Sequence, residues 1–164
     1  MHVCRASIFA WLLLPLALGA ADPVVGSVEE LNQQFRSAQP GTVIRLAPGT
    51  YRGGGHFVGL AGSAEQVIVI EAADPANPPL FSAEQGGTGA MQLSGCSHVT
   101  LRHLRVTGFP ANGINADDGG EPGQLSRGLR FENLIIENTG PKGNHDALKL
   151  SGLGRLGHRH GWLS

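Results

Sequence analysis

Cysteine and aromatic residues are scarce in this sequence. Two of the 164 residues are cysteine, Cys4 and Cys96, and 5% are Phe, Trp or Tyr. Because Cys4 lies in an N-terminal segment that we expect to be removed, Cys96 remains alone and disulfides cannot stabilise the monomer. We expect Cys96 to be a buried structural thiol. The 25 glycines and few aromatics are typical of many short strands joined by turns and do not suit a helical bundle.

Several catalytic and binding motifs are missing as well. The sequence has no Gly-x-Ser-x-Gly elbow, no Cys/His spacing typical of zinc, and no glycine loop with the Lys-Ser partner that binds phosphate. We interpret the glycine run at 53–55 as a turn. With 12 basic and 13 acidic residues, the formal net charge is −1, which argues against nucleic acid or an anionic membrane as a partner.

One long apolar run is present, at the N-terminus. Arg5 precedes the apolar stretch Ile8–Gly19, and small residues follow up to Ala21. We interpret residues 1–21 as a secretory signal peptide, too short to span a membrane, and Pro15 argues against a buried helix. The expected location is secreted or periplasmic, and no other stretch is apolar for long enough to cross a bilayer. Loss of Arg5 changes the formal charge from −1 to −2.

The next segment predicts one helix. Ser27 can cap it, and Glu30 occupies the capping-box position three residues later. One face at helical spacing is formed by Val28, Leu31, Phe35 and Ala38. The Pro40-Gly41 pair ends the predicted helix.

Two later segments repeat one apolar pattern. In 98–108 and 128–140, apolar residues recur at an offset of 30: Val99 and Leu129, Leu101 and Phe131, Leu104 and Leu134, Val106 and Ile136. Each segment predicts two short strands joined by a bend. A third strand type recurs at 91–95, 113–117 and 147–152. Its steps are 21 residues from Leu93 to Ile114 and 34 from Ile114 to Leu148, and the longer step contains the polar insertion 117–126.

This repetition predicts the fold. Self-similarity at such a period indicates a solenoid, and three short strands per repeat give a parallel β-helix over residues 22–152. The predicted helix would cover the open N-terminal end of its core. A β-sandwich is the alternative, but antiparallel sandwiches favour Asn-Gly hairpins at short spacing, whereas here the same three strands recur in the same order.

The phrases SVEELNQQFRSAQPGTVIRLAPGTYR, SGCSHVTLRHLRVTG and GLRFENLIIENTGPKGNHDALKLSG carry a family resemblance. From Ser27 to Gly152 the chain resembles the secreted right-handed parallel β-helix proteins of the pectate-lyase-like superfamily. The resemblance implies an all-β, right-handed parallel β-helix with an N-terminal capping α-helix, here the N-terminal part of a polysaccharide lyase. The superfamily also includes hydrolases, epimerases and non-catalytic adhesins, so the reaction stays open.

The strand pattern stops near the C-terminus. Residues 153–164 lack Val and Ile and are rich in Gly, Arg and His. We expect a non-native-looking or disordered tail, of the kind that a frameshift or a truncated gene would produce. The alternative is a genuine polar tail, although solenoids need a C-terminal cap that this segment does not encode.

Lyases of the resembled class cleave acidic, uronate-containing polysaccharides by β-elimination. The uronate carboxylate must be neutralised, a base must take the C5 proton, and the leaving oxygen must be protonated. Lys149 alternates with leucines and therefore points outward, where a base could meet the substrate, and His145 is a second candidate base or acid. A solvated surface side chain is the alternative for both residues. Lys142 and Asn115 are the predicted substrate-binding residues, with Asn115 matching Lys149 in register.

Three aspartates are candidate calcium ligands. Asp117, Asp118 and Asp146 supply the carboxylate oxygens that Ca²⁺ prefers, although Asp117 and Asp146 are not adjacent in the expected register. A solvated turn is the alternative for residues 117–120. Two other functions stay open: a glycoside hydrolase, for which Asp118 and Asp146 form the one available carboxylate pair, and a non-catalytic carbohydrate-binding or surface solenoid.

Overall fold

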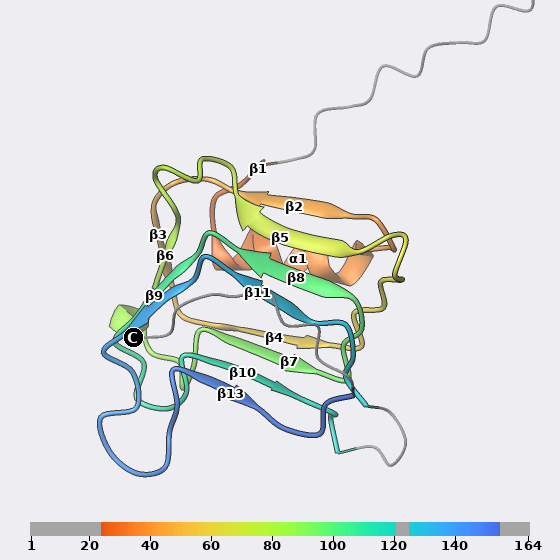
Figure 1. Ribbon diagram of the computed structural model, residues 1–164. Coiled ribbons are helices and arrows are strands. Elements are labelled where there is room, and N and C mark those ends of the chain that lie inside the picture. Colours follow the sequence, from red (N-terminus) through yellow and green to blue (C-terminus); the bar gives the residue numbers. More distant parts are fainter. Residues whose placement is uncertain (1–23, 121–124, 155–164) are drawn as a thin grey trace, which may run out of the picture.

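The computed structural model describes residues 24–120 and 125–154 (Figure 1). Within these residues the chain forms strands β1 to β13, the α-helix α1 (Val28–Ser37) and the 3₁₀ helix η1 (Ala83–Gln85). The predicted signal peptide and most of the predicted tail lie outside the described residues. No helix in the described part of the chain is long and apolar enough to cross a bilayer.

The strands form three sheets, which we name A, B and C. Sheet A contains β1 (Val24–Val25), β2 (Val43–Leu46), β5 (Ile68–Ala72), β8 (Val99–Arg102) and β11 (Arg130–Glu132). Sheet B contains β3 (Thr50–Arg52), β6 (Leu80–Ser82), β9 (Arg105–Thr107) and β12 (Ile135–Glu137). Sheet C contains β4 (Gly55–Val58), β7 (Met91–Ser94), β10 (Ile114–Asp117) and β13 (Leu148–Leu150).

From β2 onward, the chain visits sheets A, B and C in the same order in each circuit. Every pairing between these strands is parallel. Each circuit therefore lies beside the previous one, and equivalent residues of successive circuits form columns across a sheet (Figure 1). The prediction of an all-β chain with one helix near its start is confirmed.

The interior between the sheets is a continuous apolar core. Columns of inward side chains fill it, such as Ile44, Ile70 and Leu101 on sheet A, all of which are buried. Each fully buried aliphatic side chain contributes about 1.5–3 kcal/mol. Cys96 is buried, as predicted, and burial raises the pKa of its thiol.

The helix α1 covers the core at the end where β3 and β4 are edge strands. Ser27 Oγ accepts a hydrogen bond from the Glu30 N–H at 3.1 Å, and the Glu30 carboxylate accepts one from Gly26 N–H at 2.7 Å. This reciprocal pair is the predicted capping box, displaced by one residue on its return arm. Phe35 on the buried face of α1 contacts Phe57 of β4, so the helix is part of the core.

The bends between sheets A and B recur at one position in successive circuits. His103 and Asn133, which are 30 residues apart, have φ of 56° and 51°. Asn and His enter this left-handed region more readily than β-branched residues do. The predicted bend inside each repeat is therefore a single residue of left-handed backbone.

One turn prediction and one register differ from the structure. The strand β4 begins at Gly55, inside the glycine run 53–55 that we interpreted as a turn. The expected alignment of Leu93 with Ile114 is wrong, because Ile114 pairs with Met91. The error is two residues, and a shift of two leaves every side chain on its original face. Ile114 does pair with Leu148, as expected.

Two residues of the predicted tail are described. Leu153 forms a parallel bridge with Ser126, and the Gly154 N–H donates to Ser126 O at 2.7 Å. The nature of the tail beyond them stays a prediction.

Candidate functional site

The outer face of sheet C carries a column of polar side chains. His56 of β4 pairs in register with Gln92 of β7, Gln92 with Asn115 of β10, and Asn115 with Lys149 of β13. Residues paired in this way lie on the same face of the sheet, at the strand spacing of about 4.8 Å. The pairing of Asn115 with Lys149 is the expected one, and it places the predicted base at the end of this column.

Hydrogen bonds connect the column across three circuits. Asn115 Nδ2 donates to Gln92 Oε1 at 2.7 Å, and Gln92 Nε2 donates to Asp117 Oδ2 at 2.7 Å and to Ser94 Oγ at 3.0 Å. Ser94 Oγ in turn lies 3.2 Å from His56 Nε2. We name His56, Gln92, Ser94, Asn115 and Asp117 the polar ladder.

A groove lies against the ladder at the start of the sheet C strands. Its volume is about 310 Å³, and His56, Gln92 and Asn115 line it together with Thr88, Asn112 and several glycines. Because these glycines have no side chains, the groove stays open and the backbones of neighbouring circuits pack closely against each other. A methyl group on Gly54 would lie 2.0 Å from the carbonyl oxygen of Gly89, and one on Gly89 would lie 2.7 Å from that of Asn112. The strand stack therefore excludes side chains at both positions.

The structure brings some of the predicted site residues together. Lys149 and Asn115 are both half-buried neighbours on sheet C. Lys142 and His145 are exposed in the segment between β12 and β13. That segment approaches the groove, because the N–H of Asp146 donates to Oδ1 of the groove residue Asn112 at 2.9 Å.

The three predicted calcium ligands do not lie close together, because Asp146 is far from Asp117 and Asp118. Asp146 is level with Asn112, six residues before Asp118, which corresponds to roughly 20 Å along a strand. Asp117 accepts from the two amides and from Gly119 N–H, and Asp118 accepts from Gly120 N–H. Among the described residues, no group of three His, Cys, Asp or Glu side chains could hold a metal ion. The aspartates do not fit a shared ion, and calcium binding stays an untested prediction.

The same separation bears on the hydrolase alternative. Paired carboxylates of glycosidases lie about 5–10 Å apart. Asp118 and Asp146 lie roughly 20 Å apart by register, at opposite ends of their strands, so they cannot flank one glycosidic bond. The two turn bonds to Gly119 and Gly120 instead match the solvated-turn interpretation of residues 117–120.

Sequence reasoning missed four residues of the site: His56, Gln92, Ser94 and Asn112. His56 belongs to β4, which was not predicted as a strand because it begins in a run of glycines. The signal was present in His56-Phe57-Val58, where an apolar residue lies between two outward positions and Phe57 is buried. Adding this strand to the third strand type would have extended the column to four circuits.

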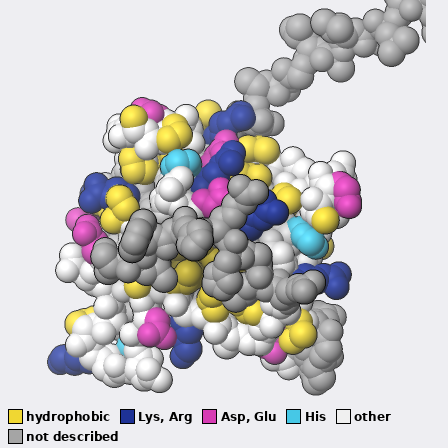
Figure 2. All heavy atoms as spheres, in the orientation of Figure 1, with side chains coloured by type: hydrophobic (Ala, Val, Ile, Leu, Met, Phe, Trp, Pro, Cys, Tyr) yellow, Lys and Arg dark blue, Asp and Glu magenta, His cyan; other side chains and the backbone are white. Residues whose placement is uncertain are grey.

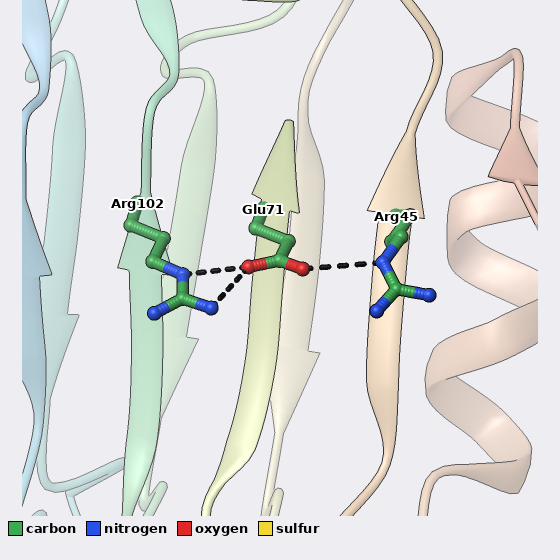
Figure 3. A network of polar contacts seen from close by, with 3 residues as sticks. All are labelled: Arg45, Glu71 and Arg102. Atoms are coloured by element: carbon green, nitrogen blue, oxygen red, sulfur yellow. Dashed lines mark hydrogen bonds and ion pairs between the residues drawn. The ribbon is translucent and has the colours of Figure 1, made fainter. Parts of the chain in front are cut away.

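The outer face of sheet A carries charged residues instead. Glu71 of β5 lies between two arginines: Arg45 Nε donates to its Oε1 at 3.3 Å, and Arg102 Nε donates to its Oε2 at 2.6 Å (Figure 3). Figure 2 shows basic and acidic side chains gathered together over β2, β5 and β8. These charges bind each other across three neighbouring strands.

Comparison with solved structures finds the same fold in an enzyme. The chain is similar to the crystal structure of an alginate lyase from Paenibacillus sp. str. FPU-7, with a TM-score of 0.53 and 23% sequence identity. The match covers 71% of this chain and 45% of that chain, so the similarity spans less than half of the lyase. At this identity the likeness concerns the fold alone. No family model matches the sequence, and no curated protein does.

Proposed function

We propose that the three sheets are the faces of a right-handed parallel β-helix of the pectate-lyase-like kind. The repeated A, B, C order and the parallel pairings support this architecture, since sandwiches and jelly rolls are built from antiparallel strands. Parallel crossover connections are right-handed in nearly all proteins, which supports the handedness. The secreted or periplasmic location remains part of the same proposal.

On this fold, we propose a polysaccharide lyase that acts on an acidic, uronate-containing polysaccharide by β-elimination. The observation that carries the proposal is the register of Lys149 with Asn115. Asn115 belongs to the polar ladder and lines the groove. Amides and hydroxyls that project from one face suit the hydroxyl groups of a sugar chain. The similarity in fold to an alginate lyase adds support, and alginate is accordingly the first substrate to test.

The proposed reaction assigns a role to each residue. The neutral amine of Lys149 takes the C5 proton, the electrons form the C4–C5 double bond, and the C4–O4 bond breaks. The departing oxygen takes a proton from His145 or from the newly formed ammonium of Lys149. Lys142 pairs with a carboxylate of the polymer, and Asn115 lies along the bound chain. No step requires calcium.

Ultraviolet absorbance of the unsaturated product tests this proposal. The wild-type chain is incubated with alginate, polygalacturonate and a neutral polysaccharide, with and without a chelator. We expect absorbance to rise with a uronate polymer alone. Lys149→Ala should lower the rate by about 10²- to 10⁴-fold, the usual contribution of a general base. Arg130→Ala, which removes an exposed cation from sheet A, should leave it unchanged.

Two other outcomes would redirect the assignment. New reducing ends without ultraviolet absorbance would indicate a hydrolase. Binding of a uronate polymer without any turnover would favour a non-catalytic carbohydrate-binding protein. The polar ladder beside the groove suits this second function as well, because binding a polysaccharide requires no catalytic base.

A further inference from the structure

Asp117 fixes the orientation of two amide side chains. An ionised carboxylate only accepts hydrogen bonds, so the amide groups beside it must present their NH₂ ends. Gln92 Nε2 donates to Asp117 Oδ2 at 2.7 Å, and Asn115 Nδ2 donates to the same oxygen at 3.3 Å. Asn115 Nδ2 also donates to Gln92 Oε1. Reversing Asn115 would place two carbonyl oxygens and a carboxylate against each other, so its Oδ1 must face away from β7.

This orientation leaves an acceptor without a donor. Asn115 Oδ1 is buried and has no hydrogen-bond partner among the described residues. A buried acceptor left unpaired is destabilising, and nearly all such groups in folded proteins are paired. A donor is therefore expected on the side of Asn115 opposite to Gln92, which is the side of β13.

Lys149 is the residue that the strand register places on that side, and since Asn115 Oδ1 has no partner in the described part of the chain, the contact requires Nζ to move within hydrogen-bond distance. Lys149 pairs in register with Asn115 across β10 and β13, so both side chains leave the same face about 4.8 Å apart. Its amine carries several donors on a flexible stem, and this stem easily spans the distance between neighbouring strands. Lys142, the other lysine of the chain, is exposed and lies outside the strand pairing.

We propose that Asn115 is a positioning residue for Lys149: its Oδ1 accepts a hydrogen bond from Nζ and holds the amine beside the groove. Asp117 acts one step further away by holding Asn115 in the orientation that presents Oδ1. The proposal deepens the proposed function, on which its catalytic meaning rests, but the contact itself can be tested without turnover. It gives Asn115 a second role besides substrate binding and gives Asp117 a role without a metal.

Competitive acylation of the lysines tests the contact directly. The full chain is treated with a trace of acetic anhydride at fixed pH, and the modified peptides are quantified by mass spectrometry. Since the chain has two lysines, the exposed Lys142 is an internal reference for Lys149. Asn115→Leu should raise the Lys149-to-Lys142 ratio several-fold, because the amine is no longer held by an acceptor. Asp117→Asn should raise it less, because Asn115 becomes free to reverse.

Asn77→Leu, an exposed turn substitution, is the matched control and should leave the ratio unchanged. Thermal unfolding checks that each variant is folded, and if Asn115→Leu is not, the isosteric Asp117→Asn carries the test. An unchanged ratio in folded variants would overturn the proposal, and the acceptor would then serve a hydroxyl of the substrate. The acylation ratio is measured without substrate. A protein that shows no lyase activity can therefore still show the contact between Asn115 and Lys149, and an active protein can lack it.

Discussion

The outer faces of sheets A and C are built on the same backbone and differ in how their polar groups are used. On sheet A, Glu71 is enclosed by two arginines, and the charges neutralise one another. On sheet C, the polar ladder joins two amides, a hydroxyl, His56 and the carboxylate of Asp117, and the acceptor Asn115 Oδ1 at its end is buried without a partner among the residues that the structure describes. The difference is that Glu71 has charged partners on both sides, whereas Asn115 presents this unpartnered acceptor, which is where the proposed contact with Lys149 lies.

The largest expected difference between the faces is in activity. Gln92→Ala removes the amide that connects the ladder and lines the groove, so kcat/KM should fall by about 10- to 100-fold, equivalent to 1–3 kcal/mol of lost hydrogen bonding. Glu71→Gln on sheet A should change it by less than about twofold. Initial rates from ultraviolet absorbance provide the measurement. Equal losses from both substitutions would contradict the division between the faces.

The next prediction concerns the backbone beneath the groove. Gly54→Ala places a methyl group against the Gly89 carbonyl, and overpacking of this kind costs about 1–3 kcal/mol of stability. Gly26→Ala is the control, because its new methyl group would meet Glu30 Oε2 at an ordinary 3.7 Å. Urea unfolding of the two variants measures the difference. Similar midpoints would show that circuits near the groove are not closely packed.

The third prediction concerns sheet A. Glu71→Ala leaves two arginines facing each other without their carboxylate. Because both arginine side chains are about 40% exposed, we expect a loss of about 1–2 kcal/mol and not the larger cost of a fully buried pair. The loss should shrink as salt is added, since screening weakens the contribution of exposed charges. A loss independent of salt would mean that packing, and not charge, holds this network.

The smallest effect is expected in the core that both faces share. The Tyr51 hydroxyl donates to the carbonyl of Val25 and lies 3.1 Å from that of Ala47. Burial raises the pKa of Tyr51 to about 12 from 10.0, so the folded state favours the neutral phenol. Its contribution is complete below pH 10 and is lost as the pH rises through 12.

Tyr51→Phe tests this effect. The variant should lose about 1 kcal/mol at neutral pH and should lack this part of the alkaline decline. Chemical denaturation of both proteins across this pH range measures the difference. Parallel curves would show that Tyr51 is not the group responsible.

The sequence predicted the parts of the fold that rest on apolar periodicity. The alternation around Leu101 and Phe131, 30 residues apart, identified paired strands, and Ser27 with Glu30 identified the start of α1. Strand β4 escaped prediction because glycines precede it, and the register of β7 was shifted because a period of two is unchanged by a step of two. The side of the sheet was therefore predictable, and the exact partner was not.

The candidate site was predictable only at one end. Alternation placed Lys149 outward and the repeat aligned it with Asn115, since both signals are local. The ladder partners Gln92 and His56 lie one or two circuits earlier, in segments of different length, so sequence spacing does not bring them together. Asp117 was assigned to a metal because its carboxylate was visible in the sequence, whereas the amides that it orients could be recognised only from the pairing of strands.

A structure of the Lys149→Ala variant with a bound saturated uronate tetrasaccharide tests most directly that the outer face of sheet C is the substrate-binding surface. The sugar chain should cross β7, β10 and β13 beside the groove, with one unit at Asn115 and the truncated side chain facing a C5 hydrogen. Binding over the arginines of sheet A, with the groove of sheet C empty, would contradict it.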